Sequence, residues 1–295
     1  MTAREQGFLL LTSSLGDTDR KPLSVSQFRT LILRSKKLPQ LRNATTVTME
    51  DMAAMGYDAK MAQRVVNLFG QRELLAEYIR YARRHGCYPI PMTHPDYPAT
   101  VIGSLGFQSP GVFWAKGDAS LLHKRAVALV GSRELNFQNR EFARQVGIMA
   151  ARKGYVLISG NAKGADSAAQ EACLDHGGEV ISIVADALTE QVARKGVLYL
   201  SEDSCDLHFT PGRALSRNRF IHCMAEATFV AQSNFRKGGT WDGTIKNLRN
   251  GWSPVYCFND GSPAAAELHT MGARLIATDE IQNIFKTERK GESFL

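Results

Sequence analysis

Residues 126–166 carry the strongest fold signal in this sequence, and they read AVALVGSRELNFQNREFARQVGIMAARKGYVLISGNAKGAD. The segment predicts a buried strand over 126–131, an amphipathic helix over 137–153 and a second strand over 155–159. Another helix is predicted from residue 164 to about residue 175. Strand, helix, strand and helix in this order, with almost entirely apolar strands, are typical of a parallel sheet covered on both faces.

The same alternation continues towards the end of the chain. Further strands are predicted over 179–184, 196–201, 227–232, 254–258 and 274–277, and helices fit between most of them. We therefore predict an α/β fold with a doubly wound, mostly parallel Rossmann-like sheet.

The sequence before residue 86 has a different, helical character. Thr48 is placed to cap one helix, residues 24–35 predict another, and a longer helix is expected from about residue 59 to residue 79. Gly56 lies between two of these helices, either as an ordinary corner or as a turn that offers N–H groups to a phosphate.

Proline then dominates the segment up to residue 123, which resists both helix and central strand. We predict three parts: a small helical domain of helix-hairpin or SAM type over 1–85, a Pro-rich connector and edge extension over 86–124, and a Rossmann-like domain over 125–295.

Composition excludes several classes of protein. The 295 residues are 44% hydrophobic and 22% charged, which excludes a disordered chain, and the longest apolar runs are too short to span a membrane. The five cysteines are scattered and form no Cys-x-x-Cys pair, which favours reduced thiols and a cytoplasmic location. The net charge of +7 suits a polyanionic partner but is weak evidence by itself.

Four loops follow strands of the predicted sheet, and ligands of such sheets bind outside the carboxyl ends of the strands. The first loop is Gly131-Ser132-Arg133. Glycine allows a tight turn, the Ser132 hydroxyl can form a hydrogen bond, and the Arg133 guanidinium has the fork shape that suits a phosphate. Taken alone, the loop is equally well explained as an ordinary turn with a solvent-facing arginine.

The second loop runs from Ser159 to Asp166 and places glycines on both sides of a lysine. Gly160, Lys163 and Gly164 bring backbone N–H groups and a cation to the start of one helix. The spacing fits neither the dinucleotide fingerprint nor the P-loop. Asp166 falls in the first helical turn, where stabilising the helix N-terminus is favoured over acid–base chemistry.

The third and fourth loops again combine cations with a helix start. The candidate residues are Arg213, Arg217, Asn218, Arg219, Lys237, Gly238, Gly239, Thr240 and Trp241. We expect Arg217 to face the ligand and Arg219 to brace a loop. Four such loops at the junctions of one sheet predict a pocket for an anion.

The sequence lacks the common motifs of hydrolases and of zinc-binding enzymes. It contains no G-x-S-x-G and no H-E-x-x-H motif. We therefore expect no enzymatic activity, no cofactor and no metal.

Taken in order, the four loops resemble the DNA-processing protein A family (DprA/Smf). The family pattern has Gly-Ser-Arg after a strand, Ser-Gly-x-Ala-Arg-Gly-x-Asp, Arg-Asn-Arg entering a helix, and a glycine loop. The corresponding residues here are 131–133, 159–166, 217–219 and 237–240. His-Pro-Asp-Tyr-Pro at 94–98 also looks like the family's lead-in to the sheet. The resemblance covers about residues 85–285 well and the N-terminal part loosely.

The resemblance implies a non-enzymatic protein that binds single-stranded DNA and loads the RecA recombinase during DNA uptake and recombination. It also implies a homodimer formed through the Rossmann domain, with no membrane contact. Departures from the family pattern point to a divergent member, for instance a paralogue in defence against foreign DNA. Lys163 replaces an arginine, Lys-Gly-Gly-Thr-Trp at 237–241 replaces a Ser-Gly-Ser-Leu type of loop, and we expect no C-terminal winged helix, since the sequence stops at Leu295.

Aromatic side chains near these loops could stack on DNA bases. Trp241 is the best candidate, followed by Phe137 and Phe235, whereas Phe220 is expected in the core. The alternative function is a Rossmann-like nucleotide sensor, or a nucleotide or nucleoside hydrolase similar to the phosphoribohydrolases. Residues 237–244 lack the glutamate of the phosphoribohydrolase loop, although Asp166 and Asp242 supply carboxylates.

Overall fold

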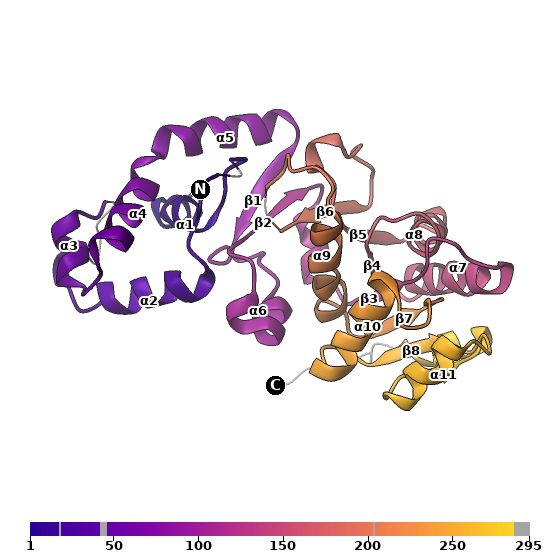
Figure 1. Cartoon of the computed structure of the whole chain (residues 1–295). Coiled ribbons are helices and arrows are strands. Elements are labelled where there is room, and N and C mark those ends of the chain that lie inside the picture. Colours follow the sequence, from indigo (N-terminus) through magenta and orange to yellow (C-terminus); the bar gives the residue numbers. More distant parts are fainter. Residues whose placement is uncertain (18, 42–45, 203, 286–295) are drawn as a thin grey trace, which may run out of the picture. The chain divides into compact units, whose positions relative to one another are not determined.

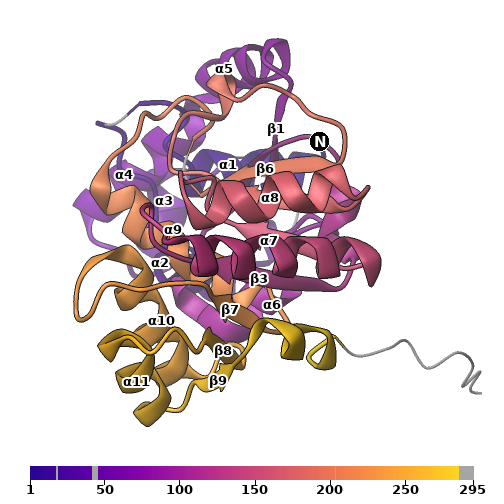
Figure 2. The ribbon, with the colours of Figure 1, turned by 90° about the vertical axis from the view of Figure 1, so that its right-hand side faces the viewer.

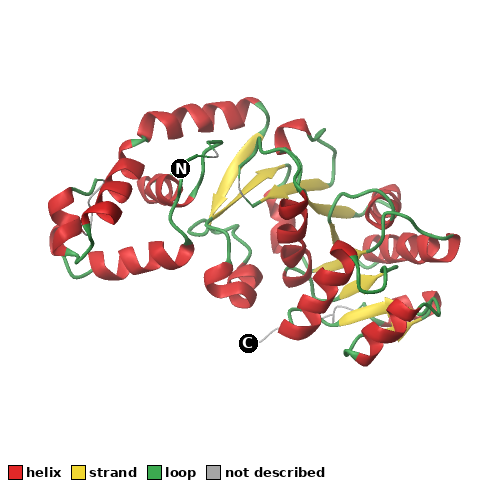
Figure 3. Cartoon of the chain, in the orientation of Figure 1, coloured by secondary structure: helices red, strands yellow, loops and turns green. Residues whose placement is uncertain are grey.

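The computed structural model describes residues 1–17, 19–41, 46–202 and 204–285, and it is shown in Figures 1 and 3. The chain forms two compact units. The first unit comprises Met1–Lys116, Asp186–Val192 and Leu200–His208, and the second comprises Gly117–Ala185, Ala193–Tyr199 and the chain from Phe209 onward. The domain boundaries expected at residues 85 and 124 stay predictions.

Among its described residues, the first unit begins with five α-helices, and side chains cap the starts of the first four. They are α1 (Ala3–Thr12), α2 (Val25–Ser35), α3 (Met49–Ala54), α4 (Ala59–Gly70) and α5 (Arg72–Arg84). Thr2, Ser24 and Thr48 each accept a hydrogen bond from the backbone of the first turn and complete a capping box. Apolar side chains of α1 to α4, among them Met52 and Val65, pack into one core.

Two features of these helices differ from the sequence prediction. Helix α1 was not expected, because its apolar residues 8–11 run without a helical period, and all four are buried. The single long helix expected from residue 59 is instead two helices. The chain leaves the helical conformation at Gln71, with ψ of 44°, and α5 starts directly after it.

The proline-rich segment forms a strand pair and a short helix, β1 (Cys87–Pro91), α6 (Ala99–Leu105) and β2 (Val112–Lys116). The strands are antiparallel, and β1 is the first strand of the sheet, with β2 as its neighbour. The N–H of Met92, directly after β1, donates to the carbonyl of Gly111, directly before β2. Successive residues of a strand direct their N–H groups to opposite sides, so positions 89 and 91 face away from β2. The prolines therefore point their missing N–H groups away from β2.

A nine-stranded sheet has the strand order β1-β2-β6-β5-β4-β3-β7-β8-β9. The other strands are β3 (Ala126–Val130), β4 (Val156–Ser159), β5 (Glu179–Ile183), β6 (Val197–Ser201), β7 (Thr228–Val230), β8 (Val255–Phe258) and β9 (Arg274–Ile276). Each of these strands was predicted, with ends that differ by at most two residues. Pairings are parallel between β3 and β4, β4 and β5, β3 and β7, β7 and β8, and β8 and β9.

Helices cover both faces of the parallel strands, as predicted for a Rossmann-like fold. They are α7 (Phe137–Arg152), α8 (Ala165–Asp175), α9 (Pro211–Cys223), α10 (Gly238–Asn250) and α11 (Pro263–Thr270). Helices α7 and α8 lie side by side on one face (Figure 2), and α9 and α10 lie on the other (Figure 1). A Cβ on Gly147 of α7 would overlap the carbonyl group of Ala169 in α8, so this close packing requires glycine.

No helix among the described residues has both the length and the apolar character needed to cross a membrane.

Candidate anion-binding site

Three loops and helix α9 surround a cavity of about 710 Å3 in the second unit, at the carboxyl edge of the parallel strands. The predicted residues that line it are Gly131, Ser132, Arg133, Asp166, Arg217, Asn218, Lys237, Gly238, Gly239 and Thr240. The predicted residues outside its lining are Ser159, Gly160, Lys163, Gly164, Arg213, Arg219 and Trp241. The topology thus brings most of the four predicted motifs to one place, and their role in binding stays a prediction.

The loop after β3 is held by hydrogen bonds from the neighbouring loops. The backbone N–H of Ser132 donates to Gln232 (3.0 Å), and its carbonyl accepts from the N–H of Ala165 (3.1 Å). The Thr240 hydroxyl donates to the carbonyl of Gly131 (2.9 Å). These bonds fix the backbone, while the Arg133 side chain is exposed at the cavity. A fixed loop with an exposed guanidinium is suited to binding an anion.

The loop after β4 is organised around the buried carboxylate of Asp166. One carboxylate oxygen accepts hydrogen bonds from the N–H groups of Gly160 and Ala162, both at 3.1 Å. Burial raises the pKa of Asp166, and the Arg217 guanidinium opposes that rise. Asp166 therefore braces the loop, which agrees with the structural role favoured for it. Lys163 is exposed on the same loop but outside the cavity lining.

Two further residues of this loop serve its backbone geometry. Ser159 is buried, and its hydroxyl accepts a hydrogen bond from the side chain of Gln170. Gly164 has φ of +88°, and a Cβ there would overlap the carbonyl oxygens of residues 132 and 133. Glycine is therefore needed where the first and second loops meet.

Arg217 of α9 is placed differently from the expectation, and the bracing role expected of Arg219 stays a prediction. Arg217, expected to face the ligand, is only 8% exposed, and it donates to the carbonyl of Ile183 (2.8 Å). Arg217 still lines the cavity, and its hydrogen bond holds it against the sheet as part of the cavity wall. Arg219, expected to be the brace, is half-buried, with its guanidinium carbon 4.7 Å from the Phe220 ring centroid. Arg213 donates to the carbonyl of Ala185 (2.8 Å).

The fourth loop presents the start of α10 to the cavity. Lys237 and Gly238 are exposed there, and no side chain caps the helix. The first N–H groups of a 13-residue helix and a lysine therefore converge on one side of the cavity. Asn218 connects this loop to α9 by donating to the carbonyl of Gly239 (3.0 Å).

The aromatic predictions need correction at Trp241. Its ring is only 8% exposed and packs edge-to-face on Phe235 at 5.7 Å, so it offers no free face to a base. Phe235 is 44% exposed, and Phe220 is fully buried, as expected. Sequence reasoning missed Phe209 and Leu215, which are exposed and line the cavity. They carry no motif, and only the course of the chain around α9 brings them there.

Other cavity residues limit what chemistry the site can perform. His222 is buried, and burial lowers the pKa of its imidazole to about 3, so the ring is neutral. Among the described residues, no three His, Cys, Asp or Glu side chains are grouped closely enough to hold a metal ion. The cationic groups at the cavity are Arg133, Arg217 and Lys237, against the carboxylates of Glu134 and Asp166.

Known proteins share both sequence and fold with this chain. DprA of Bacillus subtilis is 27% identical over 205 residues, which cover 65% of this chain and 66% of that protein. DprA of Mycobacterium tuberculosis is 31% identical over 149 residues, which cover 44% of this chain and 36% of that protein. This chain therefore spans less than two thirds of the length of these relatives.

Two solved structures of DNA processing protein A have the same fold. The Streptococcus pneumoniae protein matches with a TM-score of 0.71 and 21% identity, covering 98% of this chain and 99% of that one. The Helicobacter pylori protein, which was solved to describe its binding of single-stranded DNA, matches with a TM-score of 0.56 and 20% identity, covering 68% and 94%.

A family model adds the decisive match. The model of DNA recombination-mediator protein A aligns with residues 89–287, which is more than half of the chain and includes every loop of the cavity. The chain therefore belongs to the DNA recombination-mediator protein A family, also called DprA or Smf.

Proposed function

We propose that this protein binds single-stranded DNA and places the sugar–phosphate backbone in the cavity at the carboxyl edge of its sheet. One observation carries the proposal: the exposed Arg133, the exposed Lys237 and the N–H groups at the start of α10 converge on a single cavity. Guanidinium, ammonium and free N–H groups are the donors that proteins use for backbone phosphates.

A single strand fits this cavity better than a duplex does. Helix α9 and the start of α10 form parts of the cavity wall, whereas proteins that read a duplex place a helix in its major groove. Phe209 and Leu215 supply exposed apolar surface beside the cations, as in sites where unpaired bases stack or pack next to a bound backbone. The fold of the Helicobacter pylori protein, which binds single-stranded DNA, supports the same assignment.

We further propose that the protein binds without turnover. Asp166 uses its carboxylate to hold the N–H groups of Gly160 and Ala162, which favours a structural role over attack on a ligand. The neutral, buried His222 is a poor proton acceptor at neutral pH. Both observations speak against the nucleotide hydrolase.

The partners follow from family membership and remain proposals. We propose that the protein hands its DNA to a RecA-type recombinase and forms a homodimer through its Rossmann-like part. Since both the DNA and the recombinase are intracellular, we place its action in the cytoplasm. We propose the three-part domain division as well, with the helical residues 1–85 as a module separate from the DNA cavity.

Oligonucleotides of increasing length test the proposal against a nucleotide sensor. Fluorescence anisotropy measures the affinity for single strands of about 2 to 20 nucleotides, with mononucleotides and a duplex as competitors. We expect affinity to grow with length and the single strand to compete better than the duplex. Saturation by a mononucleotide would instead favour the sensor, and Arg133→Ala is the variant that should reduce binding to the cavity in either case.

A further inference from the structure

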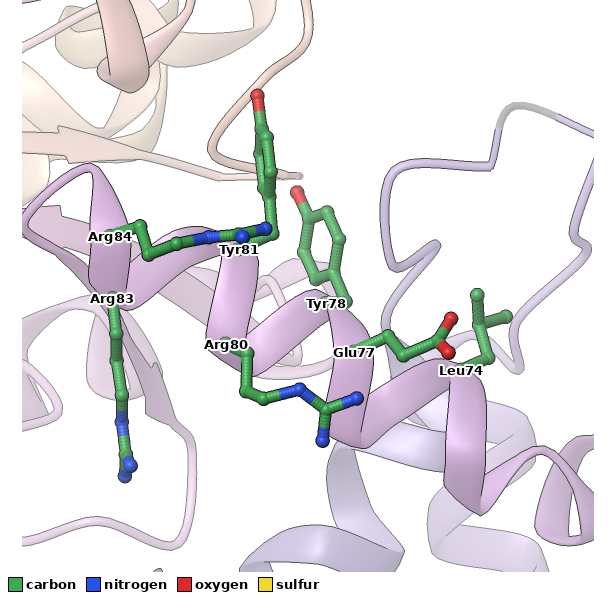
Figure 4. A pocket seen from close by; sticks show the side chains of 7 residues that line it. All are labelled: Leu74, Glu77, Tyr78, Arg80, Tyr81, Arg83 and Arg84. Carbon is green, nitrogen blue, oxygen red and sulfur yellow. The ribbon is translucent and has the colours of Figure 1, made fainter.

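A second concave surface lies in the first unit, along helix α5. This shallow hollow has a volume of about 710 Å3 and is lined by one helix, including Glu77, Tyr78, Arg80, Tyr81, Arg83 and Arg84. Figure 4 shows Arg80 and Arg83 extending to the same side of the helix and Arg84 extending towards Tyr81. We call these side chains the α5 surface.

The three arginines of the α5 surface lack counter-charges. They are exposed at helical spacing (80, 83 and 84), and no ion pair or hydrogen bond joins their side chains to another described residue. By contrast, two other arginines have carboxylate partners: Arg125 pairs with Glu226 and Arg236 pairs with Glu267, each at 2.8 Å. The one carboxylate of the hollow, Glu77, extends towards Leu74 and away from Arg83. Three neighbouring cations without an internal partner favour an external polyanion.

Aromatic rings stand beside these cations in fixed positions. The Tyr78 and Tyr81 rings stack at 6.0 Å with 23° between their planes, and the His85 ring lies 4.6 Å from that of Tyr81. The Tyr78 hydroxyl donates to the Asp206 carboxylate at 2.6 Å, and burial raises its pKa, so this ring is anchored and neutral. Tyr78 itself is buried, and the half-buried Tyr81 ring packs on it beside the arginines. An aromatic ring held in place next to cations is a combination found in sites for single strands.

We propose that the α5 surface is a second binding site for single-stranded DNA, separate from the cavity of the Rossmann-like part. Arg80, Arg83 and Arg84 bind phosphates, and the Tyr81–His85 pair contacts a base. An acidic protein segment would match the arginines but would make no use of the aromatic pair, which is why we favour DNA. The inference rests on the proposed function, because that function makes DNA the polyanion available to this chain.

The test compares a short and a long oligonucleotide on charge-matched variants of the whole chain. The short strand has about 6 nucleotides and fills one site, and the long strand has about 40 and can reach two. The test variant carries Arg80→Ala, Arg83→Ala and Arg84→Ala together. Its control carries Lys36→Ala, Lys37→Ala and Lys60→Ala, which remove the same charge from exposed positions of the same unit.

We expect the triple arginine variant to bind the long strand at least about tenfold more weakly and the short strand as tightly as the unaltered protein. The slope of log K against log salt for the long strand should become less steep by about 2, from roughly 0.7 per lost phosphate contact. The triple lysine control should change neither the affinity nor the slope.

Arg133→Ala separates failure of this inference from failure of the proposed function. If Arg133→Ala weakens both strands and the triple arginine variant weakens neither, the α5 site is refuted and the cavity stands. An equal loss for both strands in the triple arginine variant also refutes a second site. Arginine-dependent binding of a polyglutamate peptide with unchanged DNA binding would assign the α5 surface to an acidic protein. If neither Arg133→Ala nor the triple variant alters DNA binding, the proposed function itself fails.

Discussion

The guanidinium group of Arg217 occupies the space in which a side chain on Gly160 would lie. Because Gly160 has no Cβ, the arginine can pack against the loop after β4. There its charge also opposes the rise that burial causes in the pKa of Asp166. The Ser-Gly pair at the end of β4 thus serves the packing of α9 against the sheet, in addition to the turn that it permits.

A double-mutant cycle tests this contact. Arg217→Ala should lower the free energy of unfolding by about 3 kcal/mol, because it leaves a buried carboxylate without its cation. Gly160→Ala should cost about 2 kcal/mol in the unaltered protein, since the new methyl group overlaps the guanidinium. In the Arg217→Ala background the same methyl group should cost less than about 1 kcal/mol, as measured by denaturant unfolding.

Gly212→Ala is the matched control for the cycle. A Cβ on Gly212 meets only the Thr210 hydroxyl, at 3.9 Å, so its cost should be the same with and without Arg217. Additive costs for Gly160→Ala and Arg217→Ala would contradict the contact.

The exposed Arg133 should contribute to affinity and hardly to stability. Losing one charge-assisted phosphate contact costs about 1.5–3 kcal/mol, so Arg133→Ala should weaken single-stranded DNA binding by about ten- to a hundredfold. The melting temperature should stay nearly unchanged, because the side chain is exposed. Arg152→Ala, at the exposed far end of α7, is the control that should leave affinity unchanged. Equal losses for the two variants would mean that general charge explains the binding.

Salt dependence measures how many phosphates the protein neutralises. If about four phosphates are bound on a single strand, log K should fall with log salt at a slope near −3. Titrations of a short single strand at several salt concentrations give this slope. Affinity that does not respond to salt, or a clear preference for duplex, would contradict backbone binding in the cavity.

The purified protein should show no turnover of nucleic acid or nucleotide. Asp166 and His222 line the cavity. The Asp166 carboxylate accepts hydrogen bonds from two backbone N–H groups, and burial keeps the His222 imidazole neutral. Incubation with labelled single strands, ATP or nucleoside monophosphates should therefore yield no product. A product that disappears in Asp166→Asn or Asp242→Asn would reverse this conclusion in favour of the hydrolase.

Acid should destabilise the protein through His222. Its folded-state pKa of about 3 lies below the unfolded value of about 6.5, so between these values the unfolded chain binds a proton that the folded chain does not. The contribution of His222 to the free energy of unfolding is fully present above pH 6.5 and decreases as the pH falls. At pH 5 it is smaller by about 2 kcal/mol. Denaturant unfolding at pH 7 and at pH 5 gives the loss of unfolding free energy between these two values. This loss should be smaller for His222→Gln than for the unaltered protein. The exposed His208→Gln should keep the full loss, and equal losses for both variants would refute the assignment.

The sequence was sufficient for the sheet and for the position of the cavity. Short apolar strands such as residues 126–130, each followed by a polar loop and a helix, have few alternatives to a parallel sheet. Once the strands are parallel, their loops gather at one edge, so the motifs around Arg133 and Gly239 had to meet there.

Side-chain roles within the cavity could not be predicted in the same way. Arg217 and Arg219 are two residues apart on one helix, and which of them is buried depends on the rotation of α9 against β5 and the loop after β4. Trp241 of α10 packs on Phe235, which lies in the loop three residues before this helix begins. No periodic pattern in the sequence indicates this contact. Helix α1 was missed because an entirely buried helix need not be amphipathic.

The prolines of β1 also determine how copies of this chain can associate. An outer strand normally exposes a row of N–H donors on which a strand of another molecule can be added. At Pro89 and Pro91 that row has no donors, so β1 is a poor template for intermolecular β-pairing. The strand at the other margin, β9, has only three residues and begins with the exposed Arg274. Continuous sheets across two copies are therefore disfavoured at both margins, which protects the protein against edge-to-edge aggregation.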